Sequence, residues 1–147
     1  MKNRWLWAFT GTLHVPNEGA YIQDDPIIKD GVFSIDKSNL VQKLEQNDQS
    51  VRFVPFGFNI ESMSSLELAK NPYVIGLAGE EGADKLAQVA DKFKGNPYLW
   101  SFKSVSEPLA GVSALDSSWD VVLRLDVSGD DHGYDRNGYG FGVRVVK

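Results

Sequence analysis

The residues best suited to chemistry gather near the C-terminal end of the chain, in a segment that also contains three glycines, residues 129–138. Its candidate metal ligands are three carboxylates and one imidazole, at Asp130, Asp131, His132 and Asp135. Hard cations such as Ca²⁺ bind several oxygen ligands on a flexible backbone, and a histidine beside carboxylates suits a transition metal. A metal-dependent or acid–base enzyme that uses the Asp130–Asn137 loop is therefore one functional hypothesis.

The order of residues in this loop argues against a strong metal site. An EF-hand loop needs acidic or amide ligands at alternate positions and a later glutamate, and this segment does not have them. Asp, Asn and Gly also favour turns for backbone reasons alone. We therefore expect a solvated, turn-rich loop, and the sequence predicts no cofactor.

Other catalytic patterns are incomplete. The chain has no cysteine, which excludes a disulfide scaffold, a cysteine-ligated zinc site and a cysteine nucleophile. Residues 111–115 begin like a nucleophile elbow but lack its final glycine. Residues 76–82 precede a helical pattern as a phosphate-binding loop would, yet Glu80 and Glu81 would repel a phosphate there. The sequence therefore predicts no catalytic residues.

Aromatic side chains are the second notable group, at 12% of the residues with four tryptophans. Large rings fill protein cores, and they also dominate ligand pockets and the hot spots of interfaces. In a strand, residues of one parity stand on one face, which places residues 5 and 7 side by side. The candidate ligand-binding residues are Trp5, Trp7, Trp100, Trp119 and Tyr134.

Charge and hydropathy exclude some classes of partner. The formal net charge is −5, so the chain lacks the surplus of Lys and Arg that nucleic-acid binding needs. Acidity is concentrated in residues 16–50, where seven acids face three bases. No apolar run approaches the roughly 18 residues of a membrane span. The N-terminal apolar stretch has the period of a strand and no cleavage site, so we expect a cytoplasmic protein without membrane contact.

Hydrophobic periodicity predicts the fold class. A charged segment at about residues 83–94 carries an apolar stripe that includes Leu86, Val89 and Phe93, which indicates the main helix. The rest alternates as strands do. We expect an α+β fold with a mostly antiparallel sheet of about six or seven strands, and with one or two short helices on one face together with the main helix. The 147 residues suit a single globular domain over 1–147.

Local signals predict several elements. Asp30-Gly31 suits a type I′ turn, which predicts a tight hairpin over residues 27–35. Short helices are expected at about 38–46, capped by Ser38, and after Ser64, where the spacing to Glu67 is that of a capping box. A strand with a proline at residues 51–56 is expected near a sheet edge. We expect His14 at the surface or in a cross-strand pair, because it falls on the polar parity of the first strand.

The C-terminal part shows the strongest alternation. Residues 119–127 and 139–146 are expected to form adjacent, antiparallel strands at the centre of the sheet. A brief apolar strand is expected at residues 73–77, and residues 104–118 show no clear period and are expected to form a loop.

The functional hypothesis follows from the aromatic residues and the missing catalytic set. We expect a small non-enzymatic binding protein that recognises a protein partner or an apolar ligand through an aromatic-rich surface or pocket. An acidic domain that neutralises a basic partner, as immunity proteins do, is one concrete version. A homodimer is another form that such an interface could take.

Overall fold

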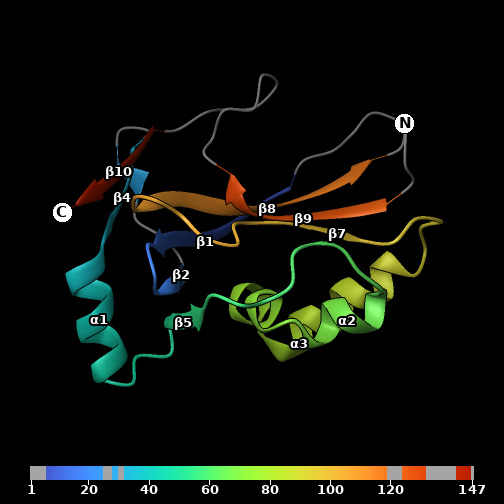
Figure 1. The fold of residues 1–147 in the computed structure, drawn as a ribbon, viewed down its shortest axis with the longest axis horizontal. Helices are drawn as coiled ribbons and strands as arrows, with labels where there is room; N and C mark the ends of the chain where they lie inside the picture. Colours follow the sequence, from blue (N-terminus) through green and yellow to red (C-terminus); the bar gives the residue numbers. More distant parts are fainter. Residues whose placement is uncertain (1–5, 25–27, 30–31, 119–123, 132–141, 147) are drawn as a thin grey trace.

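Figure 1 shows the protein as a computed structural model, which describes residues 6–24, 28–29, 32–118, 124–131 and 142–146. Its larger sheet has seven strands in the order β5-β2-β1-β8-β9-β7-β6. Their bounds are β1 (Leu6–Val15), β2 (Gly19–Asp24), β5 (Val51–Pro55), β6 (Glu61–Ser62), β7 (Tyr98–Trp100), β8 (Leu109–Ser118) and β9 (Arg124–Asp131). A smaller sheet has the order β10-β4-β3, from β3 (Ile28–Lys29), β4 (Val32–Asp36) and β10 (Gly142–Val146). The helices are α1 (Lys37–Glu45), α2 (Ser65–Lys70) and α3 (Pro72–Ala90).

The expected fold class is confirmed. In the larger sheet the pair β7–β9 is parallel, and the other pairs are antiparallel. One helix, α3, is much longer than the other two. The two-residue strand β6 and the five-residue strand β5, which ends in Pro55, form the edges of this sheet. A proline lacks a backbone N–H donor and is therefore tolerated in an edge strand. The expected edge position of residues 51–56 is confirmed.

The two faces of the larger sheet carry different helices. Ala20 and Ile22 of β2 pack in one core cluster with residues of α2 and α3, whereas Tyr21 between them packs with Leu40 of α1. Successive strand residues point to opposite faces. Strands β2 and β5 therefore stand between α1 and α3, as Figure 1 shows. Of the short helices, α2 shares the face of the main helix as expected, and α1 covers the other face.

Residues 10–15 of strand β1 are buried on both faces of the sheet, and this corrects the expectation for His14. Leu13 and Val15 belong to the cluster that α1 covers. Thr12 and His14, on the other parity, are also fully enclosed, and His14 is only 1% exposed. A strand between two covered faces does not show the alternation in burial that the sequence pattern implied.

The main helix begins earlier than expected. The sequence predicted a strand at residues 73–77 and a helix at about 83–94, but α3 starts at Pro72, includes the first of these segments and ends within the second at Ala90. The Asn71 side chain caps it by accepting hydrogen bonds from the Tyr73 and Val74 backbone N–H groups at 2.9 and 3.3 Å. A proline at the first helical position is preorganised for a helix. A short apolar run fits a strand or a buried helix equally well, and here the cap decides.

The arrangement of the C-terminal strands also differs from the expectation. Residues 109–118, expected as a loop, form β8 between β1 and β9. The last strand, β10, pairs in parallel with β4 in the smaller sheet and does not pair with β9. Alternation shows that a strand is half-buried, but it does not identify the partner strand.

Several local predictions are confirmed. Strands β3 and β4 pair antiparallel as the two arms of the expected hairpin. Helix α2 follows a complete capping box between Ser64 and Glu67. Helix α1 lies where expected and buries Leu40, but its cap is Asp36, whose side chain accepts a hydrogen bond from the Ser38 N–H.

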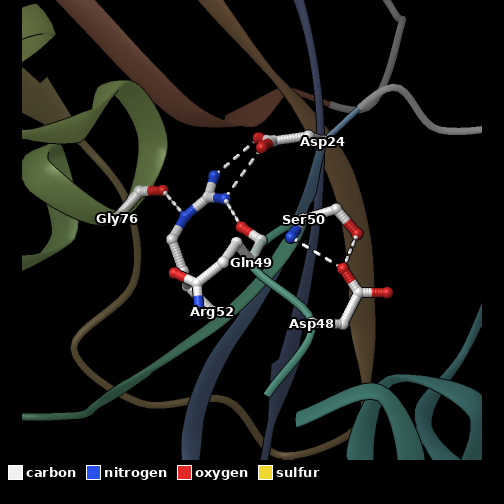
Figure 2. A network of polar contacts seen from close by, with 6 residues as sticks. All are labelled: Asp24, Asp48, Gln49, Ser50, Arg52 and Gly76. Carbon is white, nitrogen blue, oxygen red and sulfur yellow. Dashed lines mark hydrogen bonds and ion pairs between the residues drawn. The ribbon is translucent and has the colours of Figure 1, made fainter. Parts of the chain in front are cut away.

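A network around Arg52 joins the sheet to the main helix (Figure 2). The Arg52 guanidinium donates hydrogen bonds from Nη1 and Nη2 to both carboxylate oxygens of Asp24, at 2.9 and 2.6 Å. Its Nε donates to the Gly76 carbonyl oxygen at 2.6 Å. Gly79 has a φ of 77°, which breaks α3, so Gly76 lies in the last turn of the first helical segment. Carbonyl groups there lack helical partners, and Arg52 satisfies one of them.

The same glycine permits close packing between helix and sheet. A Cβ atom on Gly76 would lie 2.7 Å from Ile22 Cδ1 and 2.9 Å from Val54 Cγ2. Both distances are below normal van der Waals contact, so the first segment of α3 approaches β2 and β5 more closely than any other residue type at position 76 would allow. The Arg52 fork is therefore positioned at the closest contact between the two layers.

We predict that Arg52→Lys lowers the free energy of unfolding by about 1–2 kcal/mol, because a lysine cannot bridge Asp24 and the Gly76 carbonyl at once. Urea denaturation measures this difference. The control is Lys37→Gln, which removes the exposed ion pair between Lys37 and Glu18 and should cost less than about 1 kcal/mol. If the two variants lose the same free energy of unfolding, the hydrogen bonds of Arg52 to Asp24 and Gly76 stabilise the protein no more than an ordinary surface ion pair does.

Candidate binding surfaces

The structure separates the residues that the sequence singled out. Trp7 lies in β1 and Trp100 in β7. Asp130 and Asp131 are the last residues of β9, where the sequence predicted a loop. The remaining candidates lie outside the described residues: Trp5, Trp119, His132, Tyr134 and Asp135.

Strand register places Trp7 and Trp100 in one row across the sheet. Trp7 pairs with Ala114, Ala114 pairs with Ser128, and Ser128 pairs with Trp100. Paired residues share a face of the sheet. The two tryptophan positions therefore belong to the same face, three strand spacings or about 14 Å apart.

A row of acidic positions runs beside this aromatic row on the same face. Asp116 of β8 pairs directly with Asp126 of β9, and Asp126 pairs with Tyr98 of β7. The row between them belongs to the opposite face and is apolar: Leu6, Leu115, Val127 and Leu99. Val127 and Leu99 are buried in the cluster beneath α3. One face of these strands thus meets the helices, and the other carries aromatic and acidic residues.

The described side chains on this face are accessible. The Trp100 side chain is 44% exposed, and its ring lies 4.4 Å from that of Tyr98, measured between centroids. Helix α1 is at the far end of the sheet, over β2 and β5, and no described helix lies over β7 and β9 on this side (Figure 1). We call the positions Trp7, Tyr98, Trp100, Asp116 and Asp126 the aromatic–acidic face.

The helical side of the molecule contains a cleft that the sequence did not reveal. One hollow of about 480 Å³ lies between the segment after β5 and helix α2, with Phe56 and Pro72 among its lining residues. A second hollow of about 470 Å³ adjoins it and reaches Lys103. Both fall within the usual size of ligand sites. The two hollows share five residues: Gly57, Phe58, Asn59, Met63 and Glu67.

Asn71 connects two segments that line this cleft. It is only 5% exposed, and besides capping α3 it donates a hydrogen bond from Nδ2 to the Asn59 carbonyl oxygen at 2.8 Å. The Phe58 ring stacks on that of Tyr73, with centroids 4.5 Å apart and planes 8° from parallel. In the sequence, Asn71-Pro72 indicated only the end of a helix, so the link to residue 59 could not be predicted.

The buried His14 lies behind the same aromatic wall. Its Nε2 is 3.1 Å from the hydroxyl of Ser101, and three rings surround the imidazole. Centroid distances are 5.1 Å to Phe102, 5.7 Å to Tyr73 and 6.3 Å to Phe56. Neither His14 nor Ser101 is among the residues that line the cleft. His14 is therefore part of the core.

Among the described residues, no group of three or more His, Cys, Asp or Glu side chains could hold a metal ion. No helix in the described part of the chain is long and apolar enough to span a membrane. Comparison of the chain with protein-family models, with curated proteins and with solved structures found no match. The functional argument therefore rests on the geometry of this chain alone.

We predict that Asn71→Ala lowers the free energy of unfolding by about 1–2 kcal/mol, because the cap of α3 is lost. Asn71→Ser should lose less, since serine is also a good helix cap, although its shorter side chain cannot reach the Asn59 carbonyl. Both variants should exchange the amide hydrogens of residues 57–60 faster than the parent. Equal unfolding energies for the two variants would show that capping is not the role of Asn71.

Proposed function

We propose that the protein is a small non-enzymatic binding protein whose aromatic–acidic face recognises a cationic segment of a protein partner. The observation that carries this proposal is the strand register, which aligns Trp7 with Trp100 and sets Asp116 opposite Asp126 on the same face. Neutralisation of a basic partner protein is the most concrete form of this activity.

Charge supports a cationic partner. Like charges directly opposite each other on neighbouring strands destabilise a sheet, so the Asp116–Asp126 pair gains from a cation brought close to it. The net charge of −5 also favours the approach of a basic protein.

The aromatic positions support the same class of partner. Trp100 is 44% exposed, and its ring lies 4.4 Å from that of Tyr98 at an interplanar angle of 41°, so two tilted aromatic rings lie on the strand that pairs with Asp126. Lysine and arginine side chains bind over the faces of such rings. Exposed tryptophan and tyrosine are also the residues that contribute most to interfaces. The enzyme hypothesis needs His132 and Asp135, which lie outside the described residues.

We predict that an acetylated, amidated octalysine peptide shifts the amide resonances of β7 and β9 more than those of other strands. Asp116→Asn/Asp126→Asn should weaken this binding roughly tenfold, which corresponds to about 1.4 kcal/mol. Trp100→Ala should weaken it as well, through loss of the ring surface. Titration of ¹⁵N-labelled protein, followed by two-dimensional NMR, provides both the location and the affinity.

The matched control is Glu80→Gln/Glu81→Gln, because these two exposed residues of α3 change the net charge by the same amount. This variant should bind the peptide like the parent. If it loses as much affinity as the variant of the facing pair, or if the largest shifts fall in the acidic residues 16–50, the peptide senses only overall charge and the proposed face is wrong.

A further inference from the structure

The cleft beside α2 has the shape of a binding site for an elongated molecule. Its two hollows, of about 480 and 470 Å³, share five of their lining residues and therefore form one trough. The trough runs from Pro72 at the start of α3, past Phe58 and Met63, to Lys103 after β7. It lies on the helical side of the sheet, opposite the aromatic–acidic face, so it is independent of the function proposed above.

The walls of the trough are suited to an apolar body. Phe56 and Phe58 line it together with Met63, and the two rings lie 6.3 Å apart between centroids. The Phe58 ring is held in place by its stack on Tyr73. A methionine side chain adapts its shape to what it contacts, which suits a wall that accepts an apolar ligand.

The charges of the trough indicate an anionic end group. Lys70 lines one hollow and Lys103 lines the other. Within the described part of the chain the ion pairs are Lys37–Glu18, Arg52–Asp24 and Lys85–Glu81, so neither of these two lysines takes part in one. Lys70 and Lys103 therefore place two positive charges on the rim of the trough, in a chain of net charge −5.

Glu67, the carboxylate that lines the trough, takes part in the capping box of α2. Glu67 Oε2 accepts a hydrogen bond from the Ser64 backbone N–H at 2.7 Å as part of the capping box. This backbone bond, together with the Ser64 hydroxyl, holds the pKa of Glu67 below its usual value. The group therefore caps α2 and stays ionised, so the trough carries two lysine charges against one carboxylate charge.

We propose that this trough binds an elongated apolar molecule that carries an anionic group at one end. The apolar body lies against Phe56, Phe58 and Met63, and the anionic end meets Lys70 or Lys103. The ligand class follows from the combination of an apolar wall and two lysines that form none of the ion pairs in the described part of the chain, and it requires no catalytic step.

Two fluorescent probes test this proposal, because they share an apolar body and differ only in charge. They are 8-anilinonaphthalene-1-sulfonate, which is anionic, and N-phenyl-1-naphthylamine, which is neutral. The protein should bind the anionic probe at least about fivefold more tightly, the effect of one partly exposed ion pair. Lys70→Glu or Lys103→Glu should remove this preference and leave the neutral probe bound as before.

Two further variants locate the site. Lys92→Glu makes the same charge change at an exposed residue that does not line the trough, and it should keep the preference for the anionic probe. Asn59→Trp places a large ring in both hollows and should abolish binding of both probes, while its backbone carbonyl still accepts the bond from Asn71. Near-ultraviolet circular dichroism checks that each variant is folded.

Three outcomes would overturn the proposal. Equal affinity for the two probes in the parent protein would show that the trough does not select a ligand with an anionic end group. Binding that persists in folded Asn59→Trp would place the probes elsewhere. The absence of binding by either probe would mean that the trough takes no apolar ligand of this size. None of these outcomes affects the octalysine experiment, which concerns the opposite face.

Discussion

The pairing of β8 with β1 and β9 at Ala114 and Leu115 is the constraint on which the rest of the structure depends. In this register Leu115 and Val127 form a row on the face that α3 covers, and Trp7 and Trp100 belong to the row beside it on the other face. Because side chains alternate between faces, a slip of one residue would exchange the two sets. Burial of the apolar row against the helices therefore also determines which residues are presented on the outer face.

The helical layer depends on polar groups placed at the ends of helical segments. Arg52 donates a hydrogen bond to the Gly76 carbonyl oxygen, close to the point where Gly79 interrupts α3. The Asn71 side chain accepts hydrogen bonds from the first backbone N–H groups of the same helix. Such groups have no partners within a helix, so each side chain that satisfies them fixes the position of a helix end. Asn71 also binds the Asn59 carbonyl and thereby sets the wall of the trough. Stability and a candidate binding site thus share the same contacts.

The sequence predicted the features that depend on local chemistry. The hairpin at Asp30-Gly31, the capping box of Ser64 and the edge position of Pro55 follow from neighbouring residues, and the structure confirms them. Features that depend on distant partners could not be predicted. Strand β8 includes Gly111 and several small polar residues, which hide its alternation, and β10 pairs with a strand more than a hundred residues earlier.

In the candidate sites too, residue types could be predicted from the sequence, whereas contacts between distant residues could not. The tryptophans were recognisable as binding residues from their type, but only the register brings positions 7 and 100 into one row. Asp126 was visible on the polar side of an alternating strand, whereas Asp116 lay in a segment expected to be a loop, so their pairing had no signal in the sequence. The trough is lined by residues of β5, β6, α2 and α3, so it had no local signal in the sequence.

The most direct test of this account is a nuclear Overhauser spectrum of isotope-labelled protein, read for backbone contacts between β8 and β9. We predict cross-strand contacts that pair Ala114 with Ser128 and Leu115 with Val127, together with contacts that pair Trp7 with Ala114. Contacts that instead pair Ala114 with Val127 would put Trp7 and Asp116 on the opposite face from Trp100 and Asp126, and they would contradict both the fold and the aromatic–acidic face.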